Sequence, residues 1–204
     1  MDVIAKNVSK RFTTHWILRS FNYHFKSGTI TGISGPNGSG KTTLINILSG
    51  IIPVTKGEVL FQNEHKKIKD IDWHQHLTIA APYASLFEYL KLSELLDFHL
   101  SFKSFYQGLD ASAFYDITYL TSHKETLIQS FSSGMKQRLK LGLAILSQSD
   151  VLFLDEPLSN LDQRARDWYF KLIKEYSTCR TIIIASNEPS DFHFTDEVLR
   201  MGSD

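Results

Sequence analysis

The segment GPNGSGKTT, from Gly35 to Thr43, combines the residue types that bind a phosphate group. It matches the pattern G-x-x-x-x-G-K-[ST] and stands between a predicted strand and a predicted helix, which disfavours a glycine-rich turn without a ligand. Its glycines let the backbone curl so that N–H groups face an anion, and the following helix adds its positive N-terminal end. We expect Lys41 to reach the β- and γ-phosphates of a nucleotide and the Thr42 hydroxyl to bind Mg²⁺. The residues expected to bind the nucleotide here are Gly35, Pro36, Asn37, Gly38, Ser39, Gly40, Lys41, Thr42 and Thr43.

Two adjacent acids follow an apolar run in VLFLDEP, from Val151 to Pro157. In P-loop enzymes, an aspartate at the carboxyl end of a parallel strand holds the Mg²⁺ that bridges the β- and γ-phosphates, so Asp155 is expected to bind the metal together with Thr42. Glu156 is placed to polarise the attacking water as a catalytic base. The alternative for either acid is a cap on the turn that follows.

Short apolar runs alternate with longer helical patterns, as is typical of an α/β protein with a mainly parallel sheet. The early strands are joined by short polar connections, and we expect them to form antiparallel hairpins at one edge. The predicted strands are Asp2–Val8, Ile17–Phe25, Thr29–Ser34, Gly57–Gln62, Leu77–Ala81, Val151–Asp155, Arg180–Ser186 and Glu197–Arg200. The predicted helices are Lys41–Ser49, Leu92–Phe105, Ala111–Leu120, Gly134–Ser147 and Asp162–Tyr176.

The stretch from Tyr83 to Tyr119 has no strand pattern and contains many aromatic residues. We interpret it as the start of a helical subdomain at about residues 83–149, inserted in a single domain at residues 1–204. Because these aromatics lie largely at helical spacings, we expect most of them to pack in the subdomain core. They are Phe98, Phe102, Phe105, Tyr106, Phe114, Tyr115 and Tyr119.

Composition restricts the partners and the compartment. The 204 residues include 22 basic and 22 acidic side chains, and this balance argues against a nucleic-acid partner or a polybasic membrane anchor. Cys179 is the only cysteine, so no intrachain disulfide is expected and a reducing cytoplasm is the default. Since no window approaches the roughly 20 apolar residues of a membrane span, we expect a soluble, intracellular chain.

The segment FSSGMKQRLKLGLAILSQSDVLFLDEPLSNLD, from Phe131 to Asp162, resembles the signature helix, Walker B strand and D-loop of ATP-binding cassette (ABC) ATPases. The resemblance extends from the first strand to Met201. The sequence contains no guanine-binding NKxD motif, which argues against a GTPase. The resemblance implies an α/β fold: a P-loop NTPase core with a mainly parallel sheet, an antiparallel N-terminal β-subdomain and an inserted helical subdomain. It also implies hydrolysis of ATP to ADP and phosphate with Mg²⁺.

The same resemblance implies further site residues. Phe12 takes the position of an aromatic that stacks on adenine. In FSSGM, Ser132 and Gly134 match the family signature and would contact the γ-phosphate bound by the other subunit of a head-to-tail dimer. Ser133, Phe131 and Met135 depart from the signature. The D-loop SNLD would lie along that dimer contact, although Asp162 also suits the N-cap of the next helix.

Two departures from the family pattern affect the γ-phosphate sensors. Tyr83 stands where the family has the Q-loop glutamine, and Asn187 stands where it has the switch histidine. A neutral amide donates a weaker hydrogen bond than a charged imidazole, so we expect ordinary ATP binding with slow turnover and count Asn187 among the catalytic residues. As an alternative or additional role, Asn187 suits a helix cap before Pro189.

The resemblance implies a transporter subunit: an ATPase that forms a homodimer, or a heterodimer with a second ATPase subunit, when ATP binds. It would energise transport through a separate integral membrane permease, and so lie at the inner face of the cell membrane. Two alternatives are an ATP-dependent dimerisation switch that serves no transport, and a cassette that binds ATP with little hydrolysis.

Overall fold

The computed structural model describes residues 1–64, 66–178 and 180–202. Cys179, on which the disulfide expectation depends, lies outside the described residues. The chain separates into two compact units. The first consists of Met1–Ile79, Ser149–Glu156 and Ser177–Asp204, and the second of Ala80–Gln148 and Pro157–Tyr176.

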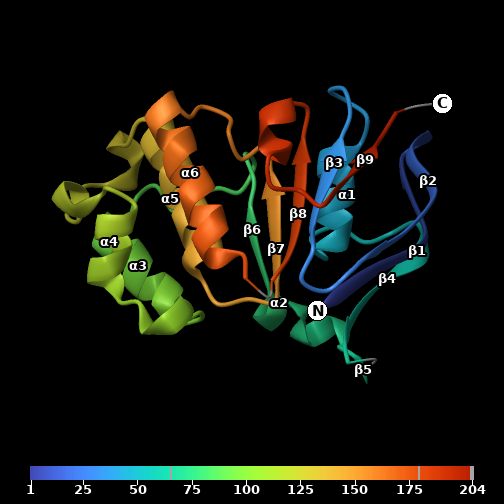
Figure 1. Ribbon diagram of the computed structural model, residues 1–204, viewed down its shortest axis with the longest axis horizontal. Coiled ribbons are helices and arrows are strands. Elements are labelled where there is room, and N and C mark those ends of the chain that lie inside the picture. Colours follow the sequence, from blue (N-terminus) through green and yellow to red (C-terminus); the bar gives the residue numbers. More distant parts are fainter. Residues whose placement is uncertain (65, 179, 203–204) are drawn as a thin grey trace. The chain divides into compact units, whose positions relative to one another are not determined.

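Two sheets organise the strands, and Figure 1 shows the order of the larger one. The smaller sheet is antiparallel along its pairs, and its order is β2 (His15–Phe25), β1 (Asp2–Phe12), β4 (Lys56–Asn63), β5 (Lys66–Lys67). The expected hairpin of the first two strands is confirmed, but a hairpin across Lys26–Gly28 is wrong, because the strand that follows joins the parallel sheet. The larger sheet has the order β6 (Leu77–Ala80), β7 (Val151–Asp155), β8 (Thr181–Ser186), β3 (Ile30–Ser34), β9 (Glu197–Arg200). The pairs β7–β8, β8–β3 and β3–β9 are parallel, as predicted.

The register of the parallel strands positions the candidate site. Every residue of β7 and β8 is buried, because the two apolar runs lie inside the sheet. Asp155 pairs with Ala185, and Ser34 pairs with Ser186. The carboxyl ends of β7, β8 and β3 therefore lie side by side, at the edge where open α/β sheets bind ligands.

Helices α1 (Lys41–Leu48) and α2 (Trp73–His76) belong to the first unit, together with short 3₁₀ turns at Asp70–Asp72 and Pro189–Phe192. The second unit contains α3 (Leu92–Leu100), α4 (Ala111–Ile117), α5 (Ser133–Leu146) and α6 (Gln163–Tyr176), with 3₁₀ turns at Tyr106–Gly108, Thr121–His123 and Ile128–Ser130. In the described part of the chain, no helix has both the length and the apolar character needed to cross a membrane.

The predicted helix Leu92–Phe105 is wrong at its C-terminal end, because α3 stops at Leu100. Beyond it, the Phe102 N–H donates to His99 O in a tightened last turn. Phe105 is then extended and forms an isolated antiparallel bridge with Ser147. This non-local pairing competes with helix continuation and cannot be read from the local pattern.

The expectation that most of the seven aromatics form the core is also wrong. Phe105, Phe114 and Tyr115 are buried, and the rings of Phe105 and Phe114 stack with centroids 5.2 Å apart. The core side of α3 is made instead by its leucines, so Phe98 remains 46% exposed; Phe102, in the turn after α3, is 75% exposed. The predicted helix Ala111–Leu120 ends early as well, at Ile117, and Tyr119 follows it in a left-handed conformation (φ 56°) with an exposed ring.

Candidate nucleotide-binding site

The phosphate loop leaves β3 and enters α1 at Lys41 in a conformation that requires glycine. Gly38 and Gly40 have φ of 83° and 96°, in the left-handed region. A Cβ at Gly40 would lie 2.9 Å from Ile17 Cγ2, and a Cβ at Gly35 would lie 2.7 Å from the Met201 carbonyl. Backbone and neighbours approach too closely at these positions for a side chain.

Lys41 turns back into the loop. Its Nζ donates to the carbonyls of Gly35 (2.8 Å) and Pro36 (3.1 Å), so the loop curls around a buried ammonium group. The Ser39 hydroxyl is buried and has no hydrogen-bond partner among the described residues. A cation and an unsatisfied donor in one curled loop suit the oxygens of a phosphate group.

Thr42 and Asp155, the two residues predicted from the sequence to bind the metal, are in contact. The Thr42 hydroxyl donates to Asp155 Oδ2 at 2.8 Å. Asp155 is 1% exposed, and its Oδ1 has no hydrogen-bond partner among the described residues. Burial raises the pKa of Asp155, against the lowering effect of the Thr42 hydrogen bond. A buried carboxylate oxygen that lacks a donor, next to a hydroxyl, fits a hard cation such as Mg²⁺.

Glu156 adopts a left-handed backbone conformation (φ 48°), and its N–H donates to Ala185 O at 2.8 Å. Its carboxylate accepts hydrogen bonds from the Ser186 hydroxyl (3.0 Å) and from the Asn187 N–H (3.2 Å). The end of β8 therefore holds the side chain that follows the end of β7. A non-glycine residue at positive φ is strained, and such strain is common at functional sites.

The Asn187 side chain contacts the phosphate loop. Its Nδ2 donates to Asn37 Oδ1 at 2.9 Å, across 150 positions in the sequence. Glu188, not Asn187, occupies the N-cap position of the turn Pro189–Phe192, and no side chain caps that turn. The alternative role of Asn187 as a helix cap is therefore wrong, because the amide is directed to the loop instead.

Phe12 lies at the exposed end of the first hairpin, with its ring 48% exposed. Lys10 Nζ lies 5.0 Å from the centre of that ring. In the same hairpin, the Trp16 ring has Arg11 at 5.4 Å and two further cations, Arg19 and Lys56, at 5.9 Å. The sequence analysis missed this cation-lined Trp16, although an aromatic among basic residues was the signal for it.

The signature residues begin α5 in the second unit. Ser132 is the N-cap, and its hydroxyl accepts from the Met135 N–H at 3.2 Å. A Cβ at Gly134 would lie 3.4 Å from Asn160 O, so the D-loop packs close to this helix end. Asp162 Oδ1 accepts from the Ala165 N–H at 2.8 Å, which confirms its N-cap role at α6.

Tyr83 lies in the turn after β6 and is 42% exposed. The carbonyls just before it are held by Lys140 of α5, whose Nζ donates to Pro82 O at 2.9 Å. Lys136, one helical turn earlier, forms a 2.7 Å ion pair with Glu88. Burial lowers the pKa of Lys140. Sequence reasoning missed this link between the loop of Tyr83 and the signature helix, and the spacing of the two lysines was its only signal.

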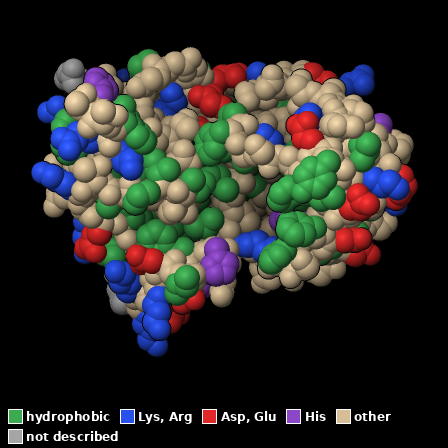
Figure 2. All heavy atoms as spheres, turned by 180° about the vertical axis from the view of Figure 1, so that it is seen from behind, with side chains coloured by type: hydrophobic (Ala, Val, Ile, Leu, Met, Phe, Trp, Pro, Cys, Tyr) green, Lys and Arg blue, Asp and Glu red, His purple; other side chains and the backbone are tan. Residues whose placement is uncertain are grey.

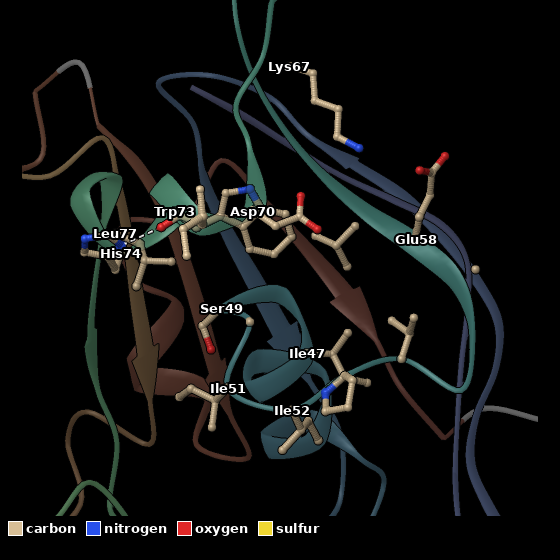
Figure 3. Close-up of a pocket in the computed structure, with 16 residues that line it drawn as sticks. Ile47, Ser49, Ile51, Ile52, Glu58, Lys67, Asp70, Trp73, His74 and Leu77 are labelled. Carbon is tan, nitrogen blue, oxygen red and sulfur yellow. Dashed lines mark hydrogen bonds between the residues drawn. The ribbon is translucent and has the colours of Figure 1, made fainter.

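A separate apolar hollow of about 750 Å³ lies in the first unit, and Figure 3 shows its labelled residues around the end of α1. Ile51, Ile52 and Trp73 contribute apolar side chains, with Asp70 and His74 from the adjoining turn and helix. No residue of the phosphate loop lines it, so this hollow is distinct from the candidate nucleotide site.

Comparison with solved structures gives the fold class. The chain superimposes on the dimeric MJ0796 cassette of a bacterial ABC transporter with a TM-score of 0.84 at 20% identity, covering 98% of this chain and 94% of that one. The fold is therefore that of an ABC ATPase cassette. A family model described as "ABC transporter" matches residues 18–159. The chain belongs to the ABC transporter family.

Two curated relatives of this ABC cassette come from Bacillus subtilis (strain 168). The uncharacterized ABC transporter ATP-binding protein YybJ is 31% identical over 186 residues, covering 91% of this chain and 85% of YybJ. The uncharacterized ABC transporter ATP-binding protein YcbN is 29% identical over 189 residues, covering 91% of this chain. The chain spans only 61% of the length of YcbN.

Replacing Asp155 with Asn is expected to stabilise the ABC cassette in the absence of nucleotide and metal. The folded-state pKa of Asp155 is raised by burial, so the ionised carboxylate costs stability above that pKa. We expect a gain of about 1 kcal/mol at pH 7, or ~2–4 °C in Tm for a chain of this size. The Asn side-chain oxygen can still accept from Thr42.

Calorimetry at a series of pH values tests this expectation. As the pH falls through the raised folded-state pKa toward the ordinary aspartate value of about 3.9, the wild-type carboxyl is protonated and the difference from the variant should vanish. A variant with a lower Tm than the wild type at pH 7 would contradict the view that the ionised Asp155 carboxylate lowers the stability of the protein when no cation is bound.

Proposed function

We propose that this chain binds ATP with Mg²⁺ and hydrolyses it to ADP and phosphate. The observation that supports this best is the buried Asp155 Oδ1, which has no hydrogen-bond partner among the described residues and lies beside the Thr42 hydroxyl at the phosphate loop. When bound, Mg²⁺ would neutralise charge on the β- and γ-phosphates. Thr42 and Asp155 are the residues proposed to hold it.

The other loop residues are proposed to bind and orient the substrate. Lys41 Nζ donates to two loop carbonyls, and because an ammonium group has three hydrogens, the third is proposed to donate to a phosphate oxygen. Phe12 offers an exposed ring for adenine. Glu156 accepts the proton of the attacking water. The Asn187 backbone N–H contacts Glu156 and its side-chain amide contacts Asn37 of the loop, so the amide is proposed to donate a neutral hydrogen bond to the γ-phosphate.

We propose that ATP binding joins two cassettes, as a homodimer or with a second ATPase subunit. Ser132 and Gly134 lie at the first turn of α5, where helix N–H groups and a hydroxyl suit an anion presented by another chain. The dimeric form of the MJ0796 cassette supports this arrangement by analogy of fold. Size measurement with and without ATP would test it, and a chain that stays monomeric with bound ATP would contradict it.

We further propose that the cassette energises transport through a separate integral membrane permease, and that it is held by that permease at the cytoplasmic face. An exposed aromatic patch in the second unit supports this: Phe87, Tyr89, Phe98 and Phe102 are 44%, 71%, 46% and 75% exposed. Their rings meet edge to face, with centroids 5.1–6.0 Å apart. Figure 2 shows exposed hydrophobic side chains grouped among charged ones. Contiguous apolar surface of this kind marks interaction sites.

The proposal is tested by measuring Mg²⁺-dependent phosphate release from purified chain, with Lys41→Ala as the variant that should lose ATP binding. Binding without phosphate release would identify the binding-only cassette instead. Affinity purification from detergent-solubilised membranes then separates the remaining functions. A co-purifying polytopic membrane protein supports the transporter subunit, and soluble partners alone support the dimerisation switch.

Replacing Phe98 and Phe102 together with Ser should remove the membrane partner and leave the isolated ATPase unchanged. Loss of anchoring aromatics in an interface typically costs about 2 kcal/mol or more, which is ~30-fold in affinity. The measurement is the amount of membrane protein recovered with the variant. Tyr119→Ser, which removes an exposed aromatic outside the patch, serves as the matched control. Equal recovery with both variants would contradict the patch assignment.

A further inference from the structure

The Ser186 hydroxyl lies between two carboxylates at the end of β8. Its Oγ lies 3.0 Å from Glu156 Oε2 and also donates to Asp191 Oδ2. The Glu188 N–H donates to the same oxygen at 3.0 Å. Ser186 is fully buried and Asp191 is 3% exposed, whereas Glu156 is only partly buried.

A hydroxyl has one hydrogen, so Ser186 can donate to only one of the two carboxylates at a time. Glu156 is open to water and also has the Asn187 N–H, while Asp191 is shielded from water and depends on donors from the protein. Asp191 is therefore the stronger competitor for the Ser186 hydrogen. When Asp191 takes it, Oγ presents only lone pairs to Glu156, so the Glu156 carboxylate loses the Ser186 donor and is held less firmly at the end of β8.

Asp191 is firmly placed for this competition. It lies in the 3₁₀ turn Pro189–Phe192, and its N–H donates to Glu188 O at 3.1 Å. The next side chain, Phe192, packs against Gly32 of β3 so closely that a Cβ there would lie 2.6 Å from the ring. The turn is thus packed against the sheet, and Asp191 cannot move away from Ser186 unless Phe192 loses its contact with Gly32.

We propose that Asp191 is a positioning residue of the hydrolysis site, which draws the Ser186 hydrogen away from Glu156 and leaves Glu156 free to turn toward the attacking water. This inference rests on the proposed role of Glu156 in ATP hydrolysis. Without Asp191, the Ser186 hydrogen passes to Glu156 and holds its carboxylate at the end of β8, away from the water.

Steady-state kinetics of four chains tests the proposal: wild type, Asp191→Ala, Ser186→Ala and the double variant. Because a well-placed base contributes roughly 10²–10⁴-fold, partial restraint of Glu156 should lower kcat by about tenfold in Asp191→Ala, with KM for ATP unchanged. The distinctive result is suppression: adding Ser186→Ala should restore kcat to that of Ser186→Ala alone, because no hydroxyl remains to restrain Glu156. Asp191→Asn, whose amide oxygen still accepts from Ser186, should keep kcat close to wild type.

The outcomes separate this inference from the proposed function. Turnover that depends on Glu156 but is unaffected by Asp191→Ala would overturn the inference alone. The inference would also be overturned if Asp191→Ala and Ser186→Ala each lowered kcat and the double variant showed the sum of the two losses. Such addition is expected when the two residues act only on the structure and independently of each other. A wild type without Glu156-dependent hydrolysis would overturn both. Tm measured on every variant identifies a loss of fold, and Asp191→Asn remains informative if Asp191→Ala does not fold.

Discussion

Replacing Glu156 with Gln is expected to lower ATP turnover by about 10²–10⁴-fold while ATP still binds. The amide is nearly the same size, and its oxygen can still accept the hydrogen bond from the Asn187 N–H. It cannot take the proton of the attacking water, so the chemical step loses its base. The phosphate loop and Asp155 are untouched. Phosphate release should therefore fall at saturating ATP, and equilibrium binding of ATP should not.

The contrast between hydrolysis and binding makes this test specific. If ATP binding joins two cassettes, the Gln variant should also accumulate as an ATP-bound dimer, which size measurement would detect. Glu58→Gln is a matched control, because Glu58 is an exposed acid of the first unit that lies outside the site. Turnover in Glu156→Gln equal to that of the wild type would contradict the catalytic assignment. Loss of ATP binding would indicate a role in the site other than that of a base.

Replacing Asn187 with His is expected to raise kcat by about 5- to 150-fold. The reason is that a charged donor stabilises the γ-phosphate in the transition state by roughly 1–3 kcal/mol more than a neutral one. The Asn187 side-chain amide donates to Asn37 Oδ1 at 2.9 Å, and the Asn187 backbone N–H donates to Glu156, so this residue contacts both the loop and the base. A histidine would give up the contact with Asn37 and keep the backbone contact with Glu156. The measurement is kcat and KM for ATP in the two proteins.

Asn187→Gln provides the control for side-chain size, because it keeps a neutral amide at the same position. We expect no acceleration from it. If the histidine variant turns over no faster than the wild type, the neutral amide does not limit hydrolysis and the expectation of slow turnover is wrong. Acceleration by both variants alike would assign the effect to lost contact with Asn37 instead of to charge.

Much of the fold could be predicted because its signals are local. The strand Val151–Asp155 was predicted with its observed bounds, since a run of buried apolar residues ends abruptly at two acids. The phosphate loop was recognisable because its backbone conformation requires glycine, as the left-handed φ of Gly38 and Gly40 shows. The first antiparallel hairpin and the parallel sheet followed from short polar connections and from alternating strands and helices.

Errors arose where distant contacts override local pattern. The helical spacing of the apolar residues continues past Leu100, but the helix ends there because Phe105 forms an isolated bridge with Ser147. The aromatic spacing around Phe98 and Phe102 suggested core, while leucines already filled the buried side of α3. The Lys140 contact with Pro82 O joins segments 58 positions apart, and no short window contains both.

Residue types and spacing were sufficient to recognise a P-loop ATPase and to name Lys41, Thr42, Asp155 and Glu156, because their chemistry depends on short motifs. The arrangement around Glu156 was decided by folding. Parallel register brings the ends of β7, β8 and β3 together, so Ser186 and Asn187 meet a carboxylate about 30 positions earlier in the chain, and Asn187 meets Asn37 across 150. Contacts of this kind arise from the pairing of strands, and pairing depends on the packing of the whole sheet, which no single segment encodes.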